Sequence, residues 1–112
     1  MKEGERNVLV NILTSDGTYK KRPAFILKIM PKYGDLLLCG ISTQIHQLIP
    51  NFDLLIEENS IDFSTSGLIK ESIVRLGYLS VIPSHYIEGK LGFISKKSHK
   101  LLLDRLCAYL IK

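Results

Sequence analysis

The stretch that decides the fold is residues 8–30, VLVNILTSDGTYKKRPAFILKIM. Its first part, Val8 to Leu13, is mostly apolar and contains several β-branched residues, which is typical of a strand. Turn residues follow from Thr14 to Gly17, and an Asp-Gly pair is among the strongest short-range signals of a hairpin. The return arm runs from Pro23 to Met30, and proline is tolerated at the first residue of a strand. Residues 8–30 therefore predict a β-hairpin.

Both faces of the return arm, residues 23–30, are largely apolar. A strand covered on two sides fits a closed barrel, or a sheet whose outer face meets a helix or a second subunit. After the turn at residues 31–34, a third strand is expected from Asp35 to Ser42. Further strands are expected at Phe52–Glu57, Ser72–Leu76 and Leu79–Pro83. Five or six short strands predict a small, mainly β barrel.

The period of the apolar residues changes after Ser95, where they recur at helical spacing. These residues are Leu102, Leu103, Leu106, Cys107, Leu110 and Ile111. Because serine is a favourable N-cap, the sequence predicts a C-terminal helix that begins after Ser95 and packs against the barrel. The two cysteines, Cys39 in a predicted strand and Cys107 in this helix, lack the spacing of metal or redox motifs and are expected to be buried.

The composition predicts one folded domain over residues 1–112, because 46% of the residues are hydrophobic and 23% are charged. The longest apolar run, Leu36 to Ile41, is far too short to cross a bilayer. Residues 1–6 lack the apolar core of a signal peptide, so a cytoplasmic location is expected. The glycines form no phosphate-binding loop, and the histidines and cysteines show no metal-ligand spacing, so we expect no cofactor and no metal.

The net charge of +4 is unevenly distributed along the chain. Residues 1–32 carry seven basic and three acidic side chains, residues 33–69 carry five acidic and no Lys or Arg, and residues 70–112 carry eight basic and three acidic. If the two ends of the chain meet in space, one face is basic, which is common in proteins that bind nucleic acid. Scattered solvated lysines are the alternative.

Two polar segments are predicted to meet at one rim, because the second strand starts where its antiparallel neighbour ends. The segments are Lys20-Lys21-Arg22-Pro23 and Ile41-Ser42-Thr43-Gln44. An arginine is charged at every working pH and its planar fork matches phosphate geometry, and the two hydroxyls can donate and accept. This combination of groups is suited to hold a phosphodiester.

Five motifs succeed one another in a pattern that spans the chain from Gly4 to Ile111. They are the Asp16-Gly17 turn, Lys21-Arg22-Pro23-Ala24, Gly40-Ile41-Ser42-Thr43-Gln44, Ser66-Gly67-Leu68 and Ser72-Ile73-Val74-Arg75. In this order and spacing they resemble the PemK/MazF family, the toxins of bacterial type II toxin-antitoxin modules.

The resemblance implies one toxin domain over residues 1–112, with an SH3-like or CcdB-like barrel and a C-terminal α-helix. It also implies a homodimer, a cognate antitoxin, and a ribosome-independent endoribonuclease that cleaves single-stranded mRNA without a metal ion. The family's catalytic pair falls on Arg22 and Ser42. The candidate RNA-binding or supporting residues are Lys20, Lys21, Thr43, Gln44, His46 and Arg75.

The chemistry expected of this pair follows from the reaction. Attack of the RNA 2′-hydroxyl on the adjacent phosphate builds negative charge on the phosphorane oxygens, which fixed donors stabilise. Arg22 suits that role, and Ser42 would hydrogen-bond the phosphate or the attacking oxygen. Without the family pattern, the residues also fit a surface ion pair of Arg22 with Asp35 or Asp53, and a turn cap at Ser42.

The groups that transfer protons stay open, because the chain departs from the family there. Some members carry an aspartate two residues after the arginine that matches Arg75, where this chain has Gly77, and others a glutamate before Arg-Pro, one position away from Asp16. Histidine is a common proton-transfer group, so His46 is either a substitute or a surface histidine. His85 and His99 are expected at the surface.

Two other functions remain open at this point. A non-enzymatic toxin of the same fold would bind a protein target such as DNA gyrase, arrest growth without RNA cleavage and depend on its C-terminal residues. A catalytically degenerate member would bind RNA through the basic rim without cutting it. The RNA cleavage sequence and the antitoxin's identity do not follow from the sequence.

Overall fold

The structure is a computed structural model that describes the backbone of residues 8–15 and 19–112 and the side chains of residues 9–12 and 21–112. Its strands are β1 (Val8–Ser15), β2 (Tyr19–Ile29), β3 (Leu36–Ser42), β4 (Leu54–Ile56), β5 (Ser72–Ile82) and β6 (Ile87–Phe93). Its helices are α1 (Ile61–Ser66) and α2 (Lys96–Leu110), with 3₁₀ turns at Ile45–Gln47 and Ser84–Tyr86. The predicted mainly β fold with a C-terminal helix is confirmed.

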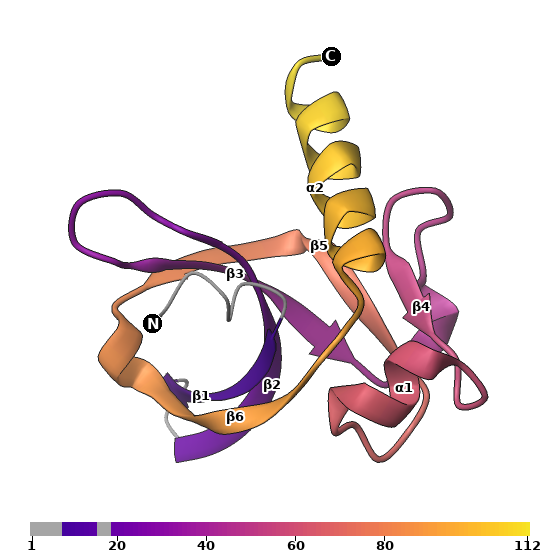
Figure 1. Cartoon of the computed structure of the whole chain (residues 1–112), viewed down its shortest axis with the longest axis horizontal. Coiled ribbons are helices and arrows are strands. Elements are labelled where there is room, and N and C mark those ends of the chain that lie inside the picture. The colour runs from indigo at the N-terminus through magenta and orange to yellow at the C-terminus, as the bar shows by residue number, and fades with distance from the viewer. Residues whose placement is uncertain (1–7, 16–18) are drawn as a thin grey trace.

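The six strands form one antiparallel sheet in the order β4-β5-β3-β2-β1-β6. The sheet curls, so that β5 and β6, which are neighbours in the chain, enclose an interior together with β1, β2 and β3 (Figure 1). Helix α2 stands beside this open barrel, and α1 lies near β4 (Figure 1). None of the helices in the described ranges is long and apolar enough to span a bilayer.

Strand β2 is covered on both faces, as its sequence predicts, because Ala24, Phe25, Ile26 and Leu27 are all buried. Alternate residues enter two different clusters. Phe25 and Leu27 belong to the cluster that α2 completes, whereas Ala24 and Ile26 face the second cluster. The alternatives of a barrel interior and a helix-covered face are therefore both realised, one on each side of the same strand.

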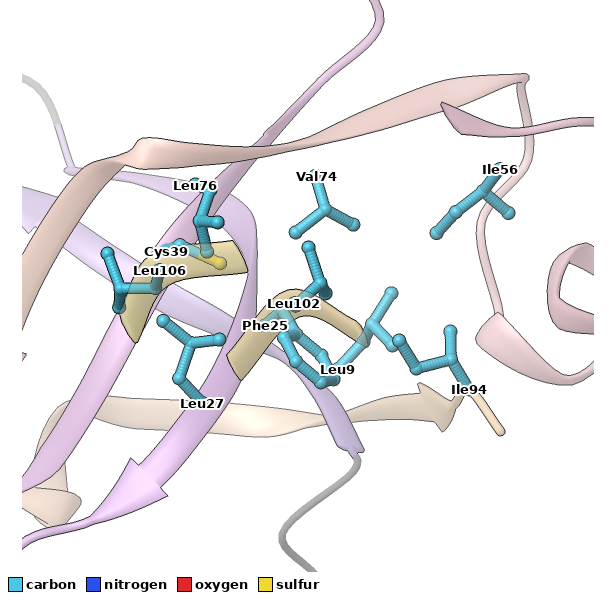
Figure 2. Close-up of a cluster of buried hydrophobic side chains, with 10 residues drawn as sticks. All are labelled: Leu9, Phe25, Leu27, Cys39, Ile56, Val74, Leu76, Ile94, Leu102 and Leu106. Atoms are coloured by element: carbon cyan, nitrogen blue, oxygen red, sulfur yellow. The ribbon is translucent and has the colours of Figure 1, made fainter. Parts of the chain in front are cut away.

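The cluster under α2, drawn in Figure 2, is the larger of the two, with ten buried residues against five. Leu102 and Leu106 of α2 lie among side chains from all six strands or their ends, including Phe25 and Val74 (Figure 2). The amide of Ser98 donates to the Ser95 hydroxyl at 3.1 Å, so the predicted N-cap is confirmed. The cluster fixes α2 against the sheet through its apolar face.

The start of the return arm differs from the sequence-based expectation. Strand β2 begins at Tyr19, so Pro23 lies inside it, opposite Asn11 of β1. The pairing of β2 with β3 extends only as far as Ala24, so at Pro23 the strand has a neighbour on one side alone. A missing amide donor is tolerated there as it is on an edge strand. The Asp-Gly turn lies outside the described residues.

The two strands expected around Gly77 are one strand, β5, that is interrupted in its pairing. Cys39 of β3 is opposite Leu79, whereas its neighbour Gly40 is opposite Arg75. The three residues between Arg75 and Leu79 therefore have no partner on β3, and β5 bulges at this point. The residues on both sides of the bulge pair with β3. Gly77, which in the sequence resembles a boundary between two strands, therefore lies inside one strand.

Two elements, β6 and α1, were not expected, and they pack closely on each other. Gly67 ends α1 in the left-handed conformation, with φ of 79°, where glycine is favoured. A Cβ atom on Gly92 of β6 would lie 2.2 Å from the backbone oxygen of Thr65. The Ser66-Gly67 motif therefore has a structural role, since it allows α1 to approach β6 without side chains between them.

Two expectations about burial are wrong. Cys39 is buried as expected, but Cys107 is exposed, because it lies on the outer side of α2. His99 is buried rather than at the surface, and its Nε2 lies 2.7 Å from the backbone oxygen of Leu27, to which it can donate. Its ring meets that of Phe25 edge-on at 5.1 Å between centroids. His99 therefore contributes to the packing between α2 and β2.

Candidate active site

A cavity of about 490 Å³ opens at the end of the barrel interior, between β2, β3 and β5. The register of the strands places its walls. Gly40 of β3 pairs with Ala24 on one side and with Arg75 on the other, so these three residues share a face of the sheet. Arg22 precedes Ala24 by two residues and Ser42 follows Gly40 by two, so they share that face as well. Because Ala24 and Gly40 have small side chains or none, they leave space between Arg22, Ser42 and Arg75, and this space is the cavity.

Ser42 lies at the rim of this cavity and is half-buried. Its Oγ accepts a hydrogen bond of 3.0 Å from the backbone amide of Gln44. This is the turn cap that was one interpretation of the sequence. Because the hydroxyl acts as acceptor in that contact, its own proton remains to be donated to a group in the cavity. Thr43 and Gln44 are exposed and do not line the cavity.

Arg22 lines the same cavity and has an exposed side chain. Across the described part of the chain, no ion pair or hydrogen bond engages its guanidinium, so the alternative of a pair with Asp35 or Asp53 is not formed. The carboxylate of Asp53 is 4% exposed and accepts the backbone amides of Ile49 at 2.9 Å and Leu76 at 3.1 Å. The charge of Arg22 is therefore available to a ligand.

Arg75 is the second cation of the cavity, and two neighbours hold it in place. Its NH1 donates a hydrogen bond of 2.9 Å to the Oε1 of Gln47, in the 3₁₀ turn after β3. Its guanidinium lies 3.8 Å from the centroid of the Tyr78 ring, a cation–π contact. Arg75 is therefore oriented at the cavity wall before any ligand arrives.

The other predicted supporting residues do not gather at the cavity. Lys21 is exposed and, as the neighbour of Arg22 in a strand, points to the opposite face. His46 is exposed in the 3₁₀ turn and is not part of the cavity wall. The backbone of Lys20 belongs to β2, but its side chain lies outside the described residues. His85 is exposed, as expected, and stacks on Tyr86.

Cys39 also reaches the cavity wall, but it is poorly suited to act as a nucleophile. Burial, with the nearby charge of Asp53 as a smaller cause, raises the pKa of its thiol from 9.0 to about 12. The thiol is therefore protonated, and only a thiolate is a strong nucleophile. Among the described residues, no group of three His, Cys, Asp or Glu side chains could hold a metal ion.

Sequence reasoning missed Gln47 and Tyr78. Gln47 lies five residues beyond Ser42, and no motif marks it. Tyr78 follows Gly77 in β5, and its place beside Arg75 depends on the bulge that separates Arg75 from Leu79 in the register. The one available signal is an aromatic residue three positions after an arginine, across a glycine, which is too common to point to a site.

No family model matches the chain, and no curated protein matches it. Among solved structures it is similar to the Mycobacterium tuberculosis toxin MazF-mt6, with a TM-score of 0.66 and 18% sequence identity over 90% of this chain and 94% of that one. At that identity the likeness establishes the fold, and the chain therefore has a MazF/PemK-like fold.

Proposed function

We propose that this protein is the toxin of a type II toxin-antitoxin module and that it cleaves single-stranded mRNA without a metal ion. The observation that carries the proposal is the convergence of Arg22, Ser42 and Arg75 on one cavity of a MazF-like fold. Arg22 and Ser42 are the two residues onto which the family's catalytic pair falls. The cavity lies at the mouth of a barrel, a common position for a ligand site.

The reaction suits the groups that the cavity offers. When the 2′-oxygen attacks the phosphorus, negative charge grows on the two non-bridging oxygens of the phosphorane. Arg22 and Arg75 supply permanent positive charge on the two sides of the small residues Ala24 and Gly40. Ser42 can donate its proton to the phosphate while the Gln44 amide holds its oxygen. Such preorganised donors usually account for the largest share of catalysis.

The test is cleavage of a long, weakly structured RNA by the purified protein in excess EDTA. Cuts at a fixed sequence that leave a 2′,3′-cyclic phosphate and a 5′-hydroxyl are expected, and they should be lost in Arg22→Ala and Ser42→Ala. Lys97→Ala is the matched control, because it removes an exposed cation on α2, away from the cavity. Intact RNA with the folded wild-type protein would refute the nuclease.

We also propose a cognate antitoxin whose acidic segment covers the cavity, where its carboxylates would take the place of RNA phosphates. The exposed guanidinium of Arg22 and the second cation Arg75 provide the complementary charge. A homodimer in the cytoplasm is part of the same proposal, and light scattering of the purified protein tests the dimer. A stable antitoxin complex in which Arg22 remains accessible would contradict this mode of inhibition.

A protein-binding toxin is the second candidate, and one observation favours it. Tyr109 and Leu110 at the end of α2 and Ile111, its C-cap, are 57%, 66% and 84% exposed, next to a cavity of about 510 Å³ between α2 and residues 49–52. Exposed apolar residues grouped in this way are typical of an interaction site. Growth arrest with intact cellular RNA, abolished by Ile111→Asp and retained in Arg22→Ala, would select this candidate.

A further inference from the structure

The proposed cleavage needs a proton at the 5′-oxygen that leaves. Departure of an unprotonated alkoxide is slow, and a positioned acid typically contributes about a hundredfold to ten-thousandfold in rate. The described residues that line the cavity include no aspartate, glutamate or histidine. The carboxylate that some relatives of the resembled family carry two residues beyond the arginine is replaced by Gly77. A side chain of this cavity that supplies the proton must therefore be of another kind.

The cavity wall contains few groups that can give a proton. Arginine is not deprotonated in proteins, which excludes Arg22 and Arg75. The alcohols of Ser42 and Ser80 are far weaker acids than a phenol. The thiol of Cys39 is buried, and its pKa is raised to about 12. A phenol combines a hydroxyl that is protonated at neutral pH with an anion that is stable enough to form transiently.

The one phenol among the described lining residues is Tyr78, and its surroundings suit this role. Its side chain is 60% exposed, so the hydroxyl can meet a bound RNA. The guanidinium of Arg75 lies against its ring at 3.8 Å, and Gln47 holds that guanidinium from the other side. The ring therefore lies against a cation that is itself held in place, which fixes the ring at the cavity wall.

We propose that Tyr78 is the general acid of this cavity, a proposal that rests on the RNA cleavage proposed above. The 2′-hydroxyl loses its proton to solvent water, and its oxygen forms a bond to phosphorus. The bond between phosphorus and the 5′-oxygen breaks, and the phenol of Tyr78 transfers its proton to that oxygen. The products are a 2′,3′-cyclic phosphate and a 5′-hydroxyl, and the phenolate regains a proton from water. Arg75 is a positioning residue for Tyr78 in this step.

The experiment compares Tyr78→Phe with the wild-type protein on two RNAs cut at the same mapped site. The first RNA is natural, and the second carries sulfur in place of the leaving 5′-oxygen. A thiolate leaves without protonation, so the acid is needed only for the natural RNA. Tyr78→Phe keeps the ring that contacts Arg75 and removes the hydroxyl alone. Tyr86→Phe is the matched control, because Tyr86 is an exposed tyrosine outside the cavity.

We expect Tyr78→Phe to lower kcat on natural RNA by about a hundredfold or more, with KM nearly unchanged. On the sulfur-containing RNA the variant should cleave within about threefold of the wild type. A merely structural role would slow both RNAs equally and would overturn the inference. Equal cleavage of natural RNA by the variant and the wild type would overturn it as well, while leaving the proposed nuclease intact. If the wild type cuts neither RNA, both proposals fail.

Discussion

The molecule has two clusters of polar residues, one around Arg105 and one around Arg22, and they differ in whether their polar groups are bonded within the protein. Under α2, the buried carboxylate of Asp53 accepts two backbone amides, and Arg105 donates to the backbone oxygen of Asp53 at 2.7 Å. At the barrel mouth, Arg22 is exposed and engages none of the described side chains in an ion pair. Polar groups that are satisfied inside the fold stabilise it, whereas a charged group without a partner in the protein is available to a ligand. The difference separates the structural cluster around Asp53 from the cluster around Arg22, for which we propose a function.

The largest effect is expected from Arg22→Ala. Removal of one donor that stabilises the phosphorane should lower kcat/KM for RNA by about a hundredfold to a thousandfold, which corresponds to about 2.7–4 kcal/mol. The free energy of unfolding should change by less than about 0.5 kcal/mol, because an exposed side chain without protein partners is removed. Cleavage kinetics and urea denaturation followed by circular dichroism measure the two quantities. A large loss of stability would place Arg22 with the structural cluster.

The opposite pattern is expected for Asp53→Ala. The substitution leaves the amides of Leu76 and Ile49 without their acceptor, at a cost of about 2–3 kcal/mol in the free energy of unfolding. Urea denaturation checks this value, and Asp104→Ala is the matched control, because its carboxylate is exposed and pairs only with Lys100. If Asp53→Ala unfolds at the same urea concentration as the wild type, the division into two clusters is wrong.

A smaller loss is expected for Arg105→Ala, which removes the donor to the backbone oxygens of Phe52 and Asp53. The free energy of unfolding should fall by about 1–1.5 kcal/mol, because the carbonyl groups are only partly buried and water can replace the donor. RNA cleavage should persist, since Arg105 lies outside the cavity at the barrel mouth. The same two assays apply, and a selective loss of cleavage would extend the functional cluster to α2.

The regular part of the fold could be predicted from the sequence, because it depends on local patterns. The hairpin, the third strand and α2 follow from apolar runs, turn residues and helical spacing. Strand β6 could not be predicted from the sequence. Its residues, IEGKLGF, include two glycines and two charges, and they form a strand only because the edge of β1 offers a partner. Helix α1 is short and rich in Ser and Thr, so no helical spacing marks it, and its caps, Ser60 and Gly67, were recognised only in the structure.

The candidate site divides in the same way. The meeting of Arg22 and Ser42 at one cavity follows from the antiparallel pairing of two consecutive strands, so the sequence was sufficient to predict it. The contacts of Arg75 with Gln47 and Tyr78 depend on a 3₁₀ turn and on a bulge in β5, neither of which has a distinctive sequence. The positions of side chains on irregular backbone, such as Gln47 and Tyr78, could therefore be found only from the structure.

Cys39 connects the two clusters, because it lines the cavity while the charge of Asp53 acts on it. Its pKa is raised from 9.0 to about 12 in the folded protein, so between these values the folded state holds a proton that the unfolded state has lost. The contribution of this thiol to stability is thus complete below pH 9 and falls as the pH rises above it.

The smallest predicted effect follows from this decrease in stability above pH 9. The difference in free energy of unfolding between the wild type and Cys39→Ala should shrink by about 1 kcal/mol from pH 8 to pH 10, and Cys107→Ala, which removes an exposed thiol, is the matched control. The contribution of the tyrosines and lysines to the pH dependence is the same in both proteins, so it cancels in this difference. A thiol reagent gives a second measure, because it should modify the exposed Cys107 in the folded protein and reach Cys39 only on unfolding. Rapid modification of Cys39 at pH 8 would mean that the cavity wall opens to solvent, and the separation of the two clusters would then fail where they adjoin.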